Sequence, residues 1–112
     1  MTRSLFTPFT LRETEFRNRV MLSPMCQYSS PDGMATDWHQ VHLGSRAAGA
    51  PRLALTEATA VEPRARITPR CLGIWSDAHA DALESTVELL LSHGATPATH
   101  LPHARRTGAH CP

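Results

Sequence analysis

The chain has 112 residues, which is long enough for one ordinary domain and too short for two. Its formal net charge of +1 at pH 7 argues against a nucleic-acid or anionic-membrane surface, and no apolar run is long enough for a signal peptide or a bilayer span. Three widely spaced cysteines, Cys26, Cys71 and Cys111, lack the pattern of a disulfide scaffold or a paired zinc site, so we expect a protein of the reducing cytoplasm.

The first part of the chain predicts short strands. Residues 1–19 are expected to form an N-terminal hairpin or strand segment, because Pro8 interrupts a loosely alternating pattern and is tolerated only on an edge strand. The apolar run at 20–22 predicts the first buried strand, and Pro24 ends it because proline cannot donate a ladder hydrogen bond.

Chemically reactive side chains follow this strand at once: a thioether at Met25, a thiol at Cys26 and a phenol at Tyr28. Strands of α/β barrels present reactive groups at their carboxyl ends in this way. On residue statistics alone, however, Met and Cys after an apolar run are more often plain core, so both interpretations stay open at this point.

A helix is predicted at about 37–48, after a turn at 29–33. Asp37 suits the N-cap and Gln40 the capping-box position, and Gly49 ends the helix. Its apolar stripe is predicted to be Trp38, Val41 and Ala48.

The apolar run at 53–58 predicts a second strand of the kind that is buried on both faces. The segment 59–75 has no regular period, and loops of that length are usually functional or disordered. A second helix runs from an N-cap at Ser76 to about 93–94, followed by a third strand at 96–101. Its helical repeat consists of Leu83, Val87, Leu90 and Leu91. This alternation of strands and helices predicts a parallel sheet with right-handed crossovers, open or closed.

Several spaced motifs together cover about residues 5–94. In chain order they are Leu5-Phe6-Thr7-Pro8, Asn18-Arg19-Val20, Ser23-Pro24-Met25-Cys26-Gln27-Tyr28, Trp38-His39-Gln40-Val41-His42 with Ser45-Arg46-Ala47, Thr56-Glu57-Ala58-Thr59-Ala60-Val61, Arg66-Ile67-Thr68, and Gly73-Ile74-Trp75-Ser76-Asp77. They closely resemble the start of Old Yellow Enzyme-type flavoproteins, in the branch with a cysteine beside the flavin that is typified by bacterial ene-reductases and xenobiotic reductases.

This resemblance implies an α/β fold, namely the N-terminal portion, with about three strands and two helices, of a (β/α)8 TIM barrel. Residues 1–112 would then be an incomplete FMN-binding domain. Members of the family pass a hydride from NADH or NADPH through flavin N5 to an alkene activated by a carbonyl or nitro group. A flavin of this kind performs the redox chemistry while the protein orients and tunes it. The full-length parent could form a homo-oligomer.

The resemblance also implies roles for individual residues. Ser23, Pro24 and Met25 would lie along the isoalloxazine ring, and Cys26 would adjust the flavin potential with a polarizable sulfur. Ala60 would sit where only a small side chain lets the ring pack closely.

Tyr28 would offer its phenol to the substrate oxygen. Plainer alternatives remain open: Ser23 as a strand-end cap, and Cys26 as an inert buried thiol like the one expected at Cys71 and at Cys111.

The chain departs from the family pattern at 100–106, where the family has Gln-Leu-Ala-His-Ala-Gly-Arg. His100 replaces the glutamine that binds the flavin pyrimidine, and imidazole cannot offer the same paired donor and acceptor. Arg105 replaces a glycine, and Arg52 lies where small residues are usual, next to a strand in which its burial would be costly. Compensating frame errors in the coding sequence are one hypothesis for the changes in the two regions, 50–52 and 100–106.

His39 and His42 share one helix face at a spacing that also suits metal ligands, but no further ligands of matching kind accompany them, so we expect no metal site. A complete barrel needs about 250 residues, and the family's substrate-binding histidines, proton-donating tyrosine and phosphate loops lie further along its chain. We therefore expect a marginally folded or aggregating ene-reductase fragment. The alternatives are a non-catalytic remnant without flavin and, more remotely, a small histidine-based metal module.

Overall fold

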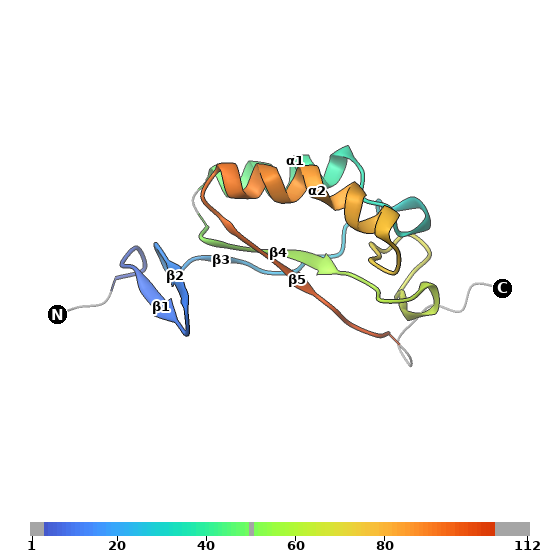
Figure 1. Cartoon of the computed structure of the whole chain (residues 1–112), viewed down its shortest axis with the longest axis horizontal. Helices are drawn as coiled ribbons and strands as arrows, with labels where there is room; N and C mark the ends of the chain where they lie inside the picture. Colours follow the sequence, from blue (N-terminus) through green and yellow to red (C-terminus); the bar gives the residue numbers. More distant parts are fainter. Residues whose placement is uncertain (1–3, 50, 105–112) are drawn as a thin grey trace.

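The computed structural model describes residues 4–49 and 51–104. These residues form a small antiparallel hairpin followed by a layer of parallel strands under two helices (Figure 1). The strands are β1 (Phe9–Leu11), β2 (Thr14–Phe16), β3 (Met21–Leu22), β4 (Leu53–Ala58) and β5 (Thr96–His100). The helices are α1 (Asp37–Ala48) and α2 (Asp77–Ser92), with short 3-10 turns η1 (Pro31–Gly33) and η2 (Pro63–Ala65). No helix among the described residues is long and apolar enough to cross a membrane.

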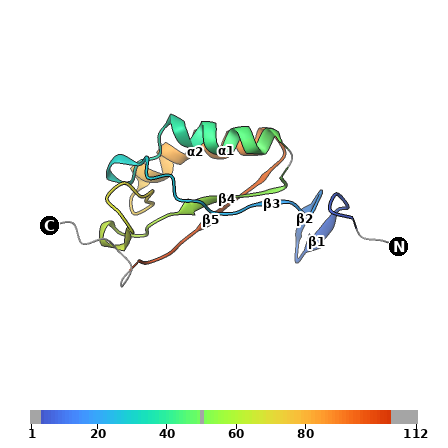
Figure 2. The same cartoon turned by 180° about the vertical axis from the view of Figure 1, so that it is seen from behind.

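The three parallel strands lie in the order in which they occur in the chain, β3-β4-β5. The register pairs Met21 with Leu53 and Leu53 with Thr96. Both crossover helices lie on the same face of the sheet, as Figure 1 and the reverse view in Figure 2 agree. The predicted α/β alternation with parallel strands is therefore confirmed.

The core lies between this sheet and the helices. It consists of Leu43, Ala47, Ala54, Leu90 and Ala95, with Leu22 packed against it. A Cβ on Gly44 of α1 would come within 2.5 Å of Leu89 Cδ2, so the glycine allows the close approach of α1 and α2. Small residues thus set the spacing of the helix layer.

The bounds predicted for α1 are confirmed, but its predicted N-cap is wrong. Asp37 is already helical, and Thr36, with extended backbone, is the N-cap. The side chain that reaches back to the cap is His39, whose Nδ1 accepts the Thr36 N–H at 2.9 Å. Gln40 instead donates to Ser85 Oγ on α2 at 2.8 Å. An imidazole at the third helical position has replaced the usual amide or carboxylate.

The predicted apolar stripe of α1 is also wrong. Trp38 and Val41 are 45% and 57% exposed, and Ala48 is exposed as well. The buried face is His39, His42, Leu43, Gly44 and Ala47. This face is small or polar because α1 must fit closely against its neighbours and take part in a polar network, so hydrophobicity alone pointed to the outer face.

The opposite face of the sheet is less covered than predicted. Met21, in the first predicted buried strand, is 53% exposed, whereas Leu22 points toward the core. The burial of β4 alternates in the same way from Leu53 to Thr56, and Glu57 is buried as well. Both helices lie on the Leu22 side, so alternate residues of each strand face away from the core. Leu91, which belongs to the predicted helical repeat of α2, is 57% exposed because it lies on the outward side of the helix.

The hairpin lies beside the amino end of the sheet (Figure 1). Phe9 and Phe16 stack with ring centroids 5.0 Å apart, and the Arg19 guanidinium lies 4.8 Å from the Phe9 centroid. Arg52 is only partly exposed, and its Nε is buried without a partner among the described residues. The expected cost of placing arginine next to a strand therefore falls on Nε, the nitrogen that joins the guanidinium to the aliphatic part of the side chain.

Candidate functional site

The segment that follows β3 lies at the carboxyl edge of the parallel sheet. Ser23 is exposed, Pro24 and Cys26 are partly buried, and Met25 and Tyr28 are 43% and 49% exposed. The carboxyl ends of parallel strands meet at one edge, so the residues leaving β4 and β5 lie at this edge too. The edge thus presents a hydroxyl, a thioether, a thiol and a phenol.

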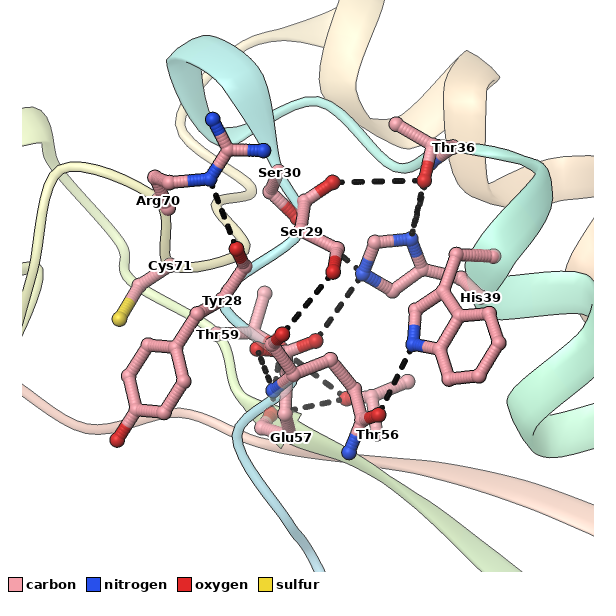
Figure 3. A network of polar contacts seen from close by, with 12 residues as sticks. Tyr28, Ser29, Ser30, Thr36, His39, Thr56, Glu57, Thr59, Arg70 and Cys71 are labelled. Carbon is pink, nitrogen blue, oxygen red and sulfur yellow. Dashed lines mark hydrogen bonds and ion pairs between the residues drawn. The ribbon is translucent and has the colours of Figure 1, made fainter.

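A buried carboxylate near the end of β4 anchors this segment. Glu57 is 4% exposed. Its Oε2 accepts the backbone N–H of Gln27 at 3.1 Å, and its Oε1 lies 3.0 Å from His39 Nε2 (Figure 3). Each carboxylate oxygen therefore faces a nitrogen from a different part of the chain.

The hydrogen bonds of His39 define its tautomer. The Thr36 backbone N–H is always a donor, so His39 Nδ1 accepts from it and carries no proton. The proton of the neutral ring is then on Nε2, which donates to Glu57 Oε1. Ser30 Oγ lies 3.2 Å from the same Nε2 and is fully buried. His39 is thus a neutral donor to a buried carboxylate.

The side chain of Gln27 ties the same segment to α1. Its Nε2 donates to the Met25 carbonyl at 2.8 Å, and its Oε1 accepts from Trp38 Nε1 at 2.9 Å. The indole N–H only donates and a carbonyl only accepts, so the two contacts agree on the orientation of the amide. Trp38 therefore faces outward to hold this segment.

Tyr28 has a backbone φ of +53°, an uncommon and strained conformation for a bulky residue. Its carbonyl accepts from Arg70 Nε at 2.9 Å, and the Ser30 N–H donates to the Arg70 carbonyl at 3.0 Å. This reciprocal pair fixes the turn against the loop 68–71. An open, apolar cavity of about 560 Å³ lies beside it, lined by Tyr28, Thr68, Pro69 and Arg70.

Burial raises the pKa of the Cys26 thiol above its ordinary value. The nearby Cys71 and Glu57 add to this increase, whereas a hydrogen bond from the Ala58 backbone opposes it. Cys26 is therefore a neutral, polarizable thiol near pH 7. Its contact with Ala58 also places it beside the end of β4.

The remaining predicted site residues leave β4 and β5. Ala60 is 2% exposed, its N–H donates to the Leu72 carbonyl at 2.9 Å, and its own carbonyl accepts the Ile74 N–H at 2.8 Å. His100 is the last residue of β5, and its carbonyl accepts the Thr59 N–H at 2.9 Å while the residue remains exposed. Ala60 is thus held in the loop, and the His100 side chain is available.

All of the residues predicted to contact cofactor or substrate share this edge, whereas Arg105 and Cys111 lie outside the described residues. The sequence did not single out the groups that hold the edge together, chiefly Glu57 and Arg70. A carboxylate inside the apolar strand run Leu53–Ala58 was the available signal, because a buried charge requires partners.

The two helix histidines have different surroundings. His39 uses both ring nitrogens in hydrogen bonds, whereas the His42 ring stacks on Trp38 with centroids 6.4 Å apart. Burial, with a smaller effect of the nearby Arg46, lowers the pKa of His42. In the part of the chain that the structure describes, no group of three or more His, Cys, Asp or Glu side chains could hold a metal ion.

Comparison with known proteins yields one family. Residues 4–110 match the model of the NADH:flavin oxidoreductase / NADH oxidase family. The NADPH dehydrogenase of Geobacillus sp. (strain WCH70) is 44% identical over 108 residues, which are 95% of this chain and 32% of that protein. The NADPH dehydrogenase of Bacillus cytotoxicus is also 44% identical over 108 residues, 95% of this chain and 31% of its own. The chain spans about a third of the length of these curated relatives.

Solved structures agree with this match. Morphinone reductase aligns with a TM-score of 0.87 at 32% identity, covering 95% of this chain and 28% of its own. Old Yellow Enzyme from Pichia sp. AKU4542 aligns with a TM-score of 0.86 at 26% identity, covering 93% of this chain and 27% of its own. The described strands and helices correspond to the N-terminal part of the barrel in these structures.

Proposed function

Because the chain belongs to the NADH:flavin oxidoreductase / NADH oxidase family, we propose that its carboxyl edge forms the part of an FMN site that lies along the isoalloxazine ring. The observation that carries this proposal is the segment Ser23–Tyr28, which is held at the carboxyl edge of β3 beside the ends of β4 and β5. Active sites of (β/α)8 barrels lie at this face.

The residues at the edge suit a planar, largely apolar ring. Met25 and Tyr28 expose apolar surface, and Ser23 adds an exposed hydroxyl. Cys26 supplies a neutral sulfur that would tune the cofactor without adding a charge. His100 stands where the family resemblance implies a glutamine, and it would offer one donor or one acceptor to the ring edge.

FMN, when bound, would supply two-electron redox chemistry with NADH or NADPH as the hydride donor. In the complete barrel we propose that Tyr28 donates a hydrogen bond to the oxygen of a carbonyl- or nitro-activated alkene, which orients the substrate and stabilises developing negative charge. Since this chain spans about a third of its relatives, the full reaction belongs to the whole barrel.

The test is a titration of FMN with the 112-residue chain, in which binding is monitored by the quenching of flavin fluorescence. Riboflavin, which lacks the phosphate, should bind equally well, because the residues proposed here face the ring. Met25→Asp should weaken binding at least about tenfold, since burial of a methionine side chain contributes roughly 1.5–3 kcal/mol.

Val41→Asp is the matched control, because Val41 is an equally apolar and 57% exposed residue on α1, away from the edge. It should bind like the parent chain. No saturable quenching in the parent chain, or equal losses in both variants, would favour the alternative of a non-catalytic remnant that binds no flavin.

A further inference from the structure

We propose that Glu57 is a positioning residue, whose carboxylate, oriented by His39, holds the segment Met25–Tyr28 so that Cys26 and Tyr28 face the cofactor side of the edge. The orientation toward a cofactor rests on the proposed function. The anchoring itself rests on the geometry of this chain alone.

The first step is the contact between Glu57 and the backbone of the segment. The Gln27 N–H lies between Cys26 and Tyr28 in the chain, and it donates to Glu57 Oε2 at 3.1 Å. A hydrogen bond to a charged acceptor is stronger than one between neutral groups and is strongly directional. One carboxylate oxygen therefore fixes the backbone at the centre of the proposed site.

The second step is the orientation of Glu57 itself. His39 Nε2 donates to the other oxygen, and the tautomer that permits this is set by the Thr36 N–H on Nδ1. Helix α1 thus aligns the carboxylate through its first turn. This arrangement is a chain of directional bonds from α1 through β4 to the segment after β3, as Figure 3 shows.

The third step is electrostatic. The carboxyl group of Glu57 is only 4% exposed and is close enough to the thiol to influence its titration. After burial itself and Cys71, Glu57 adds to the raised pKa of Cys26. The same residue therefore fixes the place of Cys26 and disfavours its thiolate.

The test measures alkylation of the 112-residue chain by iodoacetamide across a pH series, with the modified cysteines located by peptide mass spectrometry. Cys26 is partly buried and is the reporter, and Cys71 is 1% exposed and is the internal standard for unfolding. In Glu57→Gln we expect Cys26 to react on the order of tenfold faster near neutral pH, because one donor loses its acceptor and the negative charge is removed. Its pH profile should move to lower pH while Cys71 stays protected.

Two further variants separate position from general damage. Glu57→Asp keeps the charge but is one methylene too short, so Cys26 should react faster with a smaller shift of the pH profile. Thr59→Val removes a buried hydrogen bond of 2.8 Å to the Glu57 carbonyl and leaves the carboxylate in place. It should leave the Cys26 profile unchanged.

The proposal is overturned if Glu57→Gln leaves the Cys26 profile unchanged, if both cysteines accelerate together, or if they react equally in the parent chain. Flavin titration of the same proteins separates this result from the proposed function. A parent chain that binds no FMN but shows the expected alkylation would refute the flavin site and support the anchoring. If the parent chain binds FMN but Glu57→Gln leaves the alkylation of Cys26 unchanged, the flavin site is supported and the anchoring by Glu57 is refuted.

Discussion

The two ends of the parallel sheet are secured in different ways. At the carboxyl end, Ser30, His39, Glu57 and Thr59 are buried and hydrogen-bonded to one another or to backbone. At the amino end, the β1–β2 hairpin relies on the stacking of Phe9 and Phe16 and on exposed arginines.

This difference concerns precision as well as stability. Apolar stacking tolerates small displacements, whereas buried hydrogen bonds lose most of their value when distance or angle changes. The end that carries the reactive side chains is the one held by directional contacts. The hairpin end is packed less tightly, and a cavity of about 310 Å³ remains between the hairpin and the strands.

The largest predicted effect comes from His39→Ala. This change removes the donor to a buried carboxylate and the acceptor for the Thr36 N–H, and each buried polar group left without its partner costs about 1–3 kcal/mol or more. We expect hydrogen exchange of the Gln27 amide to accelerate strongly while amides of the hairpin change little.

Gln40→Ala on the same helix serves as the control, because its hydrogen bond to Ser85 is exposed and contributes about 1 kcal/mol or less. Equal acceleration in both variants would show that the buried pair is no more important than a surface contact.

A smaller loss of stability, at the opposite end of the sheet, is predicted for Phe9→Ala. The variant loses an aromatic pair and a cation–π contact with Arg19, together about 1–2 kcal/mol at a partly exposed site. Exchange of the hairpin amides should accelerate, whereas the Gln27 amide should keep its protection. Loss of protection at Gln27 would mean that the two ends of the sheet unfold together.

The sequence predicted the elements well because their signals are local. Ser76 and the leucine repeat of α2 define a helix within one segment, and the alternation of strands and helices implies a parallel sheet. It also placed Cys26 and Tyr28 directly after a strand.

The features that the sequence did not predict depend on contacts between distant segments. Hydrophobicity predicts that Trp38 belongs to the core, yet its indole N–H donates a hydrogen bond to Gln27, eleven residues earlier. The role of Glu57 depends on the Gln27 N–H and on His39, which lie 30 and 18 residues away in the chain. Periodicity carries no information about such partners, and the polar inner face of α1 even reversed the prediction of which side is buried.

The smallest predicted effect is a gradual dependence on pH. Burial lowers the pKa of His42, so the folded chain keeps this ring neutral while the unfolded chain binds a proton at the ordinary pKa of about 6.5. The contribution of the neutral His42 to the free energy of unfolding is therefore fully present above that value. It falls as the pH decreases through that value, because the unfolded state then binds more protons. The amide protection factor of Gln27 should decline from pH 7.5 to 5.5, and that of the hairpin should decline less.

His42→Gln should remove this part of the decline, whereas His93→Gln, a change at an exposed residue that ends α2, should retain it. Parallel declines at both ends of the sheet in the parent chain would contradict the comparison. Such a result would mean that acid unfolds the chain as one unit, with no separately stabilised carboxyl edge. A decline limited to the carboxyl edge and abolished by His42→Gln would instead show that the inner face of α1 acts on the site through its charge state.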